Sequence, residues 1–529
     1  MVSVKKSIIL FFMICSFSQI MANLTWTPAV TLSASTLDNS SDAQAVVDTS
    51  GNSTAAWVEN GFVYASFLPV NGSWGTPVAL SASGASSPLL GVDGSGNVTA
   101  IWLSSNGTVQ LSTLPLNGSW SAATSVSASG ASTPSLAVNP SGNAAIVWQR
   151  SGYIEASTKV LGTLSLVSVI SPVNSSNPNV SVGTNGRVVA VWSTVLASGA
   201  STVESATQSS IGGTWGSAVN ILPAPSAFFM NYPKVSVDPS GNADVIWYRY
   251  EVTSGNYSNV FVYSSILPST SISWSLPIQI SDTGIGNPDE LFAAINTDGS
   301  GNKIALWSIS YDGASFNIES SLKSPGGTWT PLTSLVNPNL YAFQGASATD
   351  TLGNDTAVFM FFDGTNVDII AAEAGTAGLD VEPVWTSYFT LSTGPDNGYP
   401  NIGINYDATT QTTYATAVWL TFNGTNTIVQ AATGQKIPIA PPTNVTVTQN
   451  VNNFGVFNDY YNTITWDASS DPDVAEYVIY RNGIFLGQFG ASSLEYIDHN
   501  QPQNGTVTYG VAAVDDEFFL SQIVQVTFP

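Results

Sequence analysis

The chain has 529 residues, of which 9% are charged, and its 35 acidic residues against 11 basic ones give a formal net charge of −24. So negative a surface repels phosphate backbones and anionic membranes, and we expect no nucleic-acid partner. The single cysteine, Cys15, lies in the first 22 residues, which excludes disulfide bonds and thiol catalysis from the rest of the chain.

The chain begins with the features of a secretory signal peptide. Lys5 and Lys6 precede an apolar run that is too short to cross a bilayer, and we expect cleavage at the end of residues 1–22. No later segment approaches the ~20 consecutive apolar residues of a membrane span. Ile14 precedes Cys15 where a lipoprotein site needs a small residue, so no lipid anchor is expected there. These features predict a secreted or cell-surface protein without a transmembrane segment.

One hairpin motif then recurs along the chain. In VSVDPSGNADVIW, Asp238 and Gly241 predict a type I turn with a bulge between two strands, and Trp247 is expected to pack between sheets. Copies spaced 44 to 60 residues apart, as in four-stranded propeller blades, end at Trp57, Trp102, Trp148, Trp192, Trp247, Trp307, Phe359 and Trp419.

A second motif, a tryptophan followed by a short alternating strand, falls between the hairpins, as in WGTPVALS at Trp74. The eighth repeat lacks this strand, whereas NLTWTPAVTLS at the start of the mature chain has it without a hairpin before it. We therefore predict an all-β fold with an eight-bladed β-propeller over residues 23–436 that is closed by the N-terminal strand, since closure leaves no open sheet edge. Seven blades, with one of the last two repeats outside the ring, is the alternative.

The hairpins over residues 23–436 resemble the VxVDxxGNxxV boxes of NHL-type propellers. The resemblance implies an architecture and no particular activity. The boxes differ from the S-x-D-x-G-x-x-W boxes of sialidases, because here the serine follows the aspartate.

The segment that follows the proline-rich stretch IPIAPPTNVTV resembles a fibronectin type III domain over residues 437–529. Trp466, Tyr477, Tyr480 and Tyr509 carry the resemblance. It implies an immunoglobulin-like β-sandwich, which serves as a spacer or second contact beside a binding domain.

The repeats contain neither cysteine nor histidine, and the one histidine, His499, lies in a turn of the C-terminal segment. Serine triads, cysteine nucleophiles and histidine–zinc sites are thereby excluded from the repeats. Asp238, Ser240 and Asn242 have the spacing of a calcium loop, but a plain hairpin turn is the stronger explanation, because no acidic residue stands at the far end of the loop. We expect no metal and no cofactor.

A carbohydrate-active enzyme, a glycoside hydrolase or lyase, is an alternative, because acidic residues from different blades can converge at a channel mouth. Acidic residues in expected loops are Glu204, Glu251, Asp289, Glu290, Asp312 and Asp396. A sialidase needs three clustered arginines, and Arg187 is expected on the face opposite Arg150 and Arg249. We assign no catalytic residue and favour a protein that is not an enzyme.

Long loops opposite the hairpin turns are expected to bring aromatic residues to one face. These candidate ligand-binding residues are Phe228, Phe229, Tyr232, Tyr248, Arg249, Tyr250, Tyr341, Phe343 and Tyr399. Such rings stack on sugars or dock a protein, which predicts a monomeric binding or adhesion protein with a glycan or extracellular protein as partner. Two alternatives remain open: the rings fill the mouth of the ring as core, or the protein is a structural envelope repeat without a ligand.

Overall fold

The structure is a computed structural model, and it describes residues 24–528 apart from 36–37, 222–227, 254–255, 285–291, 313–315, 336–340, 376–384, 386, 395, 437–438, 473, 483, 504, 516–520 and 522. The expected signal peptide lies outside the described residues. The chain divides into two compact units, one of Asn23–Lys436 and one that includes Ile437–Pro529. No helix in the described part of the chain is long and apolar enough to cross a bilayer.

The described residues form an all-β fold with ten antiparallel sheets, eight of them in the first unit. Sheet 1 contains β3 (Ser40–Val47), β4 (Ser53–Glu59), β5 (Phe62–Leu68) and β6 (Val78–Ala79). Sheet 2 contains β7 (Ser86–Val92), β8 (Val98–Leu103), β9 (Val109–Leu114) and β10 (Thr124–Ser125). Sheet 3 contains β11 (Ala131–Val138), β12 (Ala144–Arg150), β13 (Tyr153–Val160), β14 (Thr163–Leu164) and β15 (Ser168–Val169). Sheet 4 contains β16 (Ser175–Val182), β17 (Val188–Val195), β18 (Ser201–Gln208) and β19 (Val219–Asn220).

The next four sheets repeat this order. Sheet 5 contains β20 (Phe228–Val237), β21 (Ala243–Thr253), β22 (Asn256–Leu267) and β23 (Ile278–Gln279). Sheet 6 contains β24 (Ala293–Thr297), β25 (Lys303–Ser310), β26 (Phe316–Lys323) and β27 (Thr333–Ser334). Sheet 7 contains β28 (Tyr341–Thr349), β29 (Asn354–Phe362), β30 (Val367–Gly375) and β31 (Ser387–Ser392). Sheet 8 contains β32 (Asn397–Asp407), β33 (Thr412–Phe422) and β34 (Thr427–Lys436), together with β1 (Thr25–Trp26) and β2 (Val30–Thr31).

The start of the described chain supplies the outer strands of sheet 8. Trp26 of β1 is opposite Gly434, and Val30 of β2 is opposite Ala431, both on β34. The edge of β34 is thereby paired, as the missing tryptophan strand of the eighth repeat suggested.

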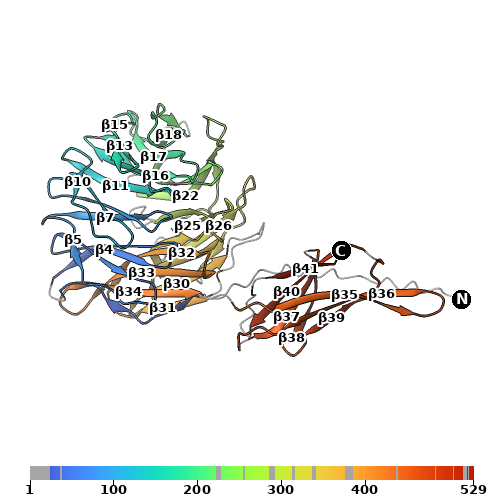
Figure 1. The fold of residues 1–529 in the computed structure, drawn as a ribbon. Coiled ribbons are helices and arrows are strands. Elements are labelled where there is room, and N and C mark those ends of the chain that lie inside the picture. Colours follow the sequence, from blue (N-terminus) through green and yellow to red (C-terminus); the bar gives the residue numbers. More distant parts are fainter. Residues whose placement is uncertain are drawn as a thin grey trace. The chain divides into compact units, whose positions relative to one another are not determined.

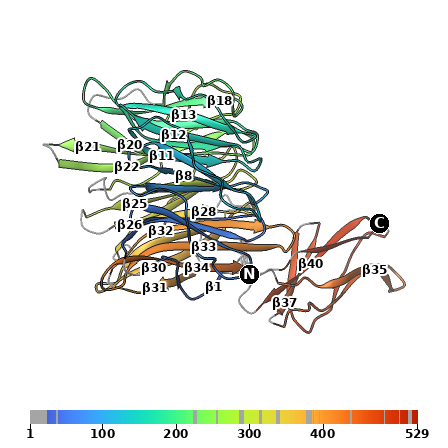
Figure 2. The same ribbon diagram turned by 60° about the vertical axis from the view of Figure 1, so that its left-hand side comes forward.

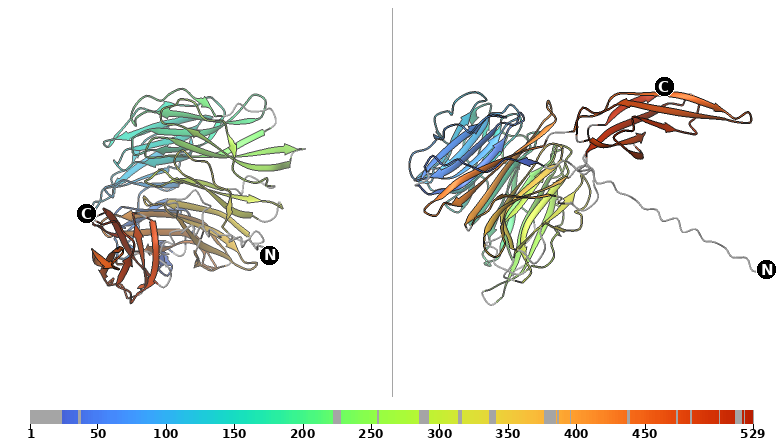
Figure 3. Two further views of the ribbon diagram at one scale, coloured as in Figure 1. Left: turned by 90° about the vertical axis from the view of Figure 1, so that its right-hand side faces the viewer. Right: turned by 90° about the horizontal axis from the view of Figure 1, so that it is seen from below.

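The eight sheets follow one another in a propeller-like arrangement. The first strand of each sheet contacts the first strand of the next, and β32 of sheet 8 contacts β3 of sheet 1. Figure 1 and Figure 2 show this succession as a change of colour from blue through green to orange, with orange β33 and β34 returning beside the blue strands. In the right-hand view of Figure 3, orange strands lie between blue and yellow ones.

The predicted hairpin turn is confirmed at Asp238. The backbone N–H of Gly241, which has a φ of 85°, donates to the Asp238 carbonyl at 2.9 Å. The Asp238 carboxylate accepts the backbone N–H of Asn242 at 2.8 Å and its side-chain amide at 2.9 Å. Asn242 Oδ1 in turn accepts the N–H of Ser269, which ties the turn to the end of β22. Four other buried carboxylates hold their own turns in the same way: Asp48, Asp93, Asp298 and Asp350.

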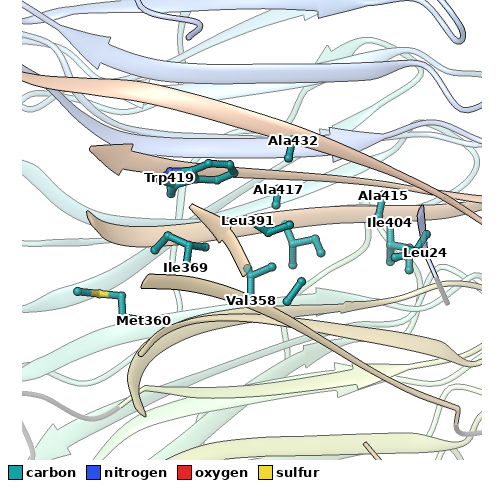
Figure 4. Packing of buried hydrophobic residues seen from close by; sticks show 12 residues of the cluster. Leu24, Val358, Met360, Ile369, Leu391, Ile404, Ala415, Ala417, Trp419 and Ala432 are labelled. Atoms are coloured by element: carbon teal, nitrogen blue, oxygen red, sulfur yellow. The ribbon is translucent and has the colours of Figure 1, made fainter. Parts of the chain in front are cut away.

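The repeated tryptophans pack between neighbouring sheets, as predicted. Trp419 is fully buried and lies in one core cluster with Val358 and Ile369 of sheet 7 and with Leu24 (Figure 4). Four of these indole N–H groups donate to a buried or half-buried glutamate: Trp57 to Glu59 at 3.0 Å, Trp148 to Glu155 at 2.9 Å, Trp192 to Glu204 at 3.2 Å and Trp307 to Glu319 at 3.0 Å. Many acidic residues therefore stabilise the fold from inside.

The second unit contains two sheets around one core. Sheet 9 contains β35 (Thr443–Asn453), β36 (Asn458–Asp467) and β39 (Glu495–Asp498). Sheet 10 contains β37 (Val474–Arg481), β38 (Ile484–Gly490), β40 (Val507–Asp515) and β41 (Val524–Phe528). Between them Trp466 packs edge-on against Tyr477, with ring centroids 5.5 Å apart, and the Tyr509 hydroxyl donates to Asp498 at 2.6 Å.

Candidate functional site

A cavity with aromatic walls lies at the ends of strands in sheets 7, 8 and 1. It has a volume of about 550 Å³ and is lined by Ser40, Phe343, Gln344, Met360, Val367, Asp396, Asn397, Gly398, Tyr399, Leu420, Phe422 and Thr427. These residues stand at the starts of first and third strands and at the ends of second strands, which are the strand ends opposite the hairpin turns. We call this cavity the loop-face hollow.

Tyr399 is the most exposed aromatic residue of the hollow, with 63% of its surface accessible. It occupies a β-bulge between Gly398 and Asn401 and has a φ of 50°, a conformation that bulky residues seldom adopt. The same bulge recurs in most first strands, where the left-handed residues are Asp42, Ser87, Thr133, Asn177, Tyr232, Gln344 and Tyr399. The bulge is thus part of the repeat. Sheet 5 also carries an aromatic residue at this position, Tyr232, but that ring is half-buried against the core, whereas the ring of Tyr399 is exposed.

The carboxylate of Asp396 and the amide of Gln344 are among the polar side chains of the hollow that have no partner within the described residues. Asn397, by contrast, is buried and engaged, since its amide donates to the Val367 carbonyl at 2.8 Å and its Oδ1 accepts the Thr421 hydroxyl at 2.7 Å. The hollow therefore combines the exposed rings of Tyr399 and Phe422 with free acceptor and donor groups beside an apolar floor.

The expected aromatic residues do not form one cluster. Phe343 and Tyr399 line the loop-face hollow, whereas Tyr341 stands beside it, 38% exposed, with its ring edge-on to Phe362. The remaining six belong to sheet 5 and do not line the hollow: Phe228, Phe229, Tyr232, Tyr248, Arg249 and Tyr250. The side chain of Phe228 lies outside the described residues.

In sheet 5 the structure places most of the expected residues in the core. Tyr248 is fully buried, and its hydroxyl lies 2.7 Å from the Phe292 carbonyl and 2.8 Å from that of Ser308. Burial raises the pKa of this hydroxyl well above its usual value. Tyr250 is also buried and stacks on Phe229 at 5.6 Å between ring centroids. These rings cannot stack on a ligand without unpacking, because their faces are already covered.

Arg249 also has an internal role. Its guanidinium lies 5.1 Å from the centre of the Tyr263 ring and donates to the Tyr263 hydroxyl at 3.0 Å. The hairpin of β21 and β22 that carries it extends beyond the neighbouring strands in Figure 2. Arg150 pairs with Glu155 at 2.6 Å, and Arg187 donates to the Gly241 carbonyl at 2.6 Å.

The acidic residues considered for catalysis are dispersed. Glu204 lies on β18 and Glu251 on β21, so the expectation that both are in loops is wrong. The Glu204 carboxylate accepts the Trp192 indole and Thr194 hydroxyl, and Glu251 accepts the Asn259 amide at 2.8 Å. The two acids Asp289 and Glu290 lie outside the described residues, and Asp312 is in the turn after β25.

Sequence reasoning considered Asp396 only as a catalytic acid and did not single out Gln344. The bulge repeat is the signal that finds Gln344, because it occupies the position of Tyr399 one sheet earlier. Nothing in the spacing of conventional motifs reveals it.

No family model and no curated protein sequence matches the chain. Among solved structures it is similar to the polysaccharide lyase Uly1, with a TM-score of 0.42 and 10% identity over 78% of this chain and 99% of that one. A PL25 ulvan lyase has a TM-score of 0.41 and 10% identity, over 74% of this chain and 93% of that one. A protein of unknown function from Dyadobacter fermentans has a TM-score of 0.40 and 10% identity, over 78% and 99%. Similarity at this level does not carry an activity over to this chain.

Proposed function

We propose that the protein is a secreted or cell-surface binding protein that recognises a glycan in the loop-face hollow. The observation that carries this proposal is the exposed ring of Tyr399 beside the unengaged groups of Asp396 and Gln344. Sugar rings stack on tyrosine faces, while carboxylates and amides bond to neighbouring hydroxyl groups. A shallow, pre-formed cavity of this kind fits recognition of one or two sugar residues.

The number of carboxylic acids that line the hollow favours binding of a glycan over its hydrolysis. Glycoside hydrolysis needs two carboxyl groups about 5–10 Å apart. Among the described lining residues Asp396 is the one carboxylic acid, and no histidine or lysine accompanies it.

The proposed architecture is an eight-bladed β-propeller, closed by the N-terminal strand, followed by a fibronectin type III domain. The pairing of β1 and β2 with β34, the contact of β32 with β3 and the NHL-like hairpins support the propeller. The two-sheet core around Trp466 supports the sandwich. Signal peptide 1–22, secretion and a monomeric state belong to the same proposal.

The test is a glycan array probed with the full chain. We expect selective binding that Tyr399→Ala abolishes and Asp396→Asn weakens about tenfold, the usual scale for a hydrogen bond to a charged group. Tyr153→Ala is the matched control, because Tyr153 is 38% exposed on β13, far from the hollow in the sheet order.

If Tyr399→Ala still bound the glycan, the binding site would lie outside the loop-face hollow. A blank array would reject glycan recognition and leave a protein partner or a structural role.

A further inference from the structure

Lys234 differs from the other basic side chains that the structure describes, because it has no hydrogen-bond or ion-pair partner among the described residues. Each of the others is engaged: Arg150 with Glu155, Lys159 with Thr99, Arg187 with the Gly241 carbonyl, Arg249 with Tyr263, Lys303 with Asp238, Lys323 with Asp244, Lys436 with Asn354 and Arg481 with Asp498. In a chain with 35 acidic residues, a cation without an acid beside it is unexpected.

Its place in the repeat makes the difference clearer. Lys234 lies on β20 opposite Ile246, one residue before the buried Trp247. At the same register position, three other sheets carry an oxygen that accepts a backbone N–H of the next first strand: Asn401 from Ala45 at 2.9 Å, Ser135 from Val180 at 3.2 Å and Asn179 from Val235 at 2.9 Å. An ammonium group cannot accept such a bond. Lys234 therefore lacks the contact between sheets that these three equivalents make.

Lys234 lines a cavity of about 320 Å³ between the first strands β16, β20, β24 and β28. The polar residues of its wall are Asn179, Ser181, Ser236, Asn296, Thr297 and Thr349. Asn179 uses its Oδ1 on Val235, which leaves its amide N–H groups for another acceptor. Ser181 Oγ accepts the Val237 N–H at 3.1 Å and retains its own hydrogen as a donor.

The electrostatics of this wall favour an anion. Burial lowers the pKa of Lys234, and no neighbouring carboxylate raises it again. Asp355 bonds to the wall residues Thr349 and Asn296. Burial raises the pKa of this carboxyl to about 7, which reduces the negative charge that it would place near a bound anion. Lys234 is half-buried, so an anion at its ammonium would supply the counter-charge that the described residues do not provide.

We propose that this cavity binds a small hydroxylated carboxylate, with Lys234 on the carboxylate and the amide of Asn179 and hydroxyl of Ser181 on its other oxygens. An inorganic anion would pair with Lys234 alone, and the amide of Asn179 and hydroxyl of Ser181 would then bond to water. A sugar-acid ring matches the volume and engages both kinds of group. This site is separate from the loop-face hollow, since the two cavities share no lining residue.

The test is calorimetric titration of the full chain with D-glucuronate, beside D-glucose and acetate. We expect D-glucuronate to bind at least tenfold more tightly than either control. Equal binding of acetate would reject the hydroxyl contacts, and equal binding of glucose would reject the ionic one. No binding of glucuronate would overturn the site.

Two variants locate the ligand. Lys234→Gln should weaken glucuronate binding at least tenfold and leave the melting temperature equal or higher. Asn179→Asp keeps an acceptor for Val235 and gives Lys234 an internal partner, so it should abolish binding while raising the melting temperature.

Tyr399→Ala, which changes the other cavity, should bind glucuronate like the unmodified chain. Unchanged affinity in both Lys234→Gln and Asn179→Asp would place the ligand elsewhere and refute the proposal.

Discussion

The backbone N–H of Leu24 lies 2.9 Å from Oε1 and 3.0 Å from Oε2 of Glu373, a residue 349 positions later. Glu373 is on β30 of sheet 7, so the start of the chain is fixed to sheet 7 through this carboxylate as well as to sheet 8 through β34. Burial raises the pKa of Glu373 from 4.5 to about 7, and burial lowers that of nearby Lys436 to about 8.

This carboxylate predicts a pH dependence of stability. Since the folded-state pKa of Glu373 exceeds the unfolded value of 4.5, the folded chain binds more protons between pH 4.5 and about 7, and the free energy of unfolding falls as pH rises through that window. Urea unfolding at pH 5 and pH 7 should show a loss on the order of 1–3 kcal/mol from this group. In Glu373→Gln, which can still accept the Leu24 N–H, the fall should be smaller. Parallel pH profiles for the two proteins would contradict this expectation.

The hairpin aspartates differ in their surroundings, which allows a matched comparison. Asp238 holds its turn and also pairs with Lys303 at 3.2 Å, where both side chains are about 4% exposed. Asp48 holds an equivalent turn and makes no ion pair among the described residues. Asp48→Asn should cost about 1 kcal/mol in unfolding free energy, the scale of one hydrogen bond. Asp238→Asn should cost about 1–2 kcal/mol more, because the buried Lys303 ammonium loses one of its two carboxylate partners and keeps Asp244 at 3.1 Å. Equal losses in thermal or urea unfolding would show that the ion pair adds nothing.

Two left-handed glycines, Gly142 in the β11–β12 hairpin turn and Gly130 in the connection before β11, predict a second contrast. Gly142 and Gly130 have φ values of 78° and 85°, but a Cβ on Gly142 would meet Asp93 Oδ2 at 2.7 Å, whereas one on Gly130 would meet nothing within 4 Å. Gly130→Ala should therefore cost about 1 kcal/mol for the left-handed conformation alone. Gly142→Ala should cost about 1–3 kcal/mol more through the steric conflict with a carboxylate fixed by Asn97. Melting temperatures that fall equally would reject close packing of successive turns.

Much of the strand order could be predicted from the sequence, because each repeat contains the residues that form its own hairpin turn. Asp238 and Asn242 are oxygen-bearing residues spaced to bond across one hairpin, and this requirement is local. The pairing of Trp26 with Gly434 was also inferable, since one repeat lacked a strand and the start of the chain had a spare one.

The candidate site was less predictable, because burial of a ring depends on the neighbouring sheet. In the sequence, Tyr248 and Tyr399 are both aromatic residues near expected loops. In the structure Tyr248 is fully buried, whereas Tyr399 is 63% exposed. Periodicity along one strand cannot show that Ser308 of the next sheet offers a carbonyl to Tyr248. The bulge that turns Tyr399 outward also adds a residue that breaks the alternation on which such reasoning depends.

The contrast between these two tyrosines predicts effects of different size on stability when a hydroxyl is removed. Tyr248→Phe deletes a donor that lies within 2.8 Å of two carbonyls in a buried site, so it should lower the unfolding free energy by about 1–3 kcal/mol. Tyr399→Phe removes a hydroxyl from an exposed ring and should change stability by less than about 0.5 kcal/mol. Urea unfolding measures both variants, and the array measures whether binding follows Tyr399 alone. If Tyr248→Phe changed ligand binding without changing stability, Tyr248 would belong to the site and the loop-face hollow would not be its centre.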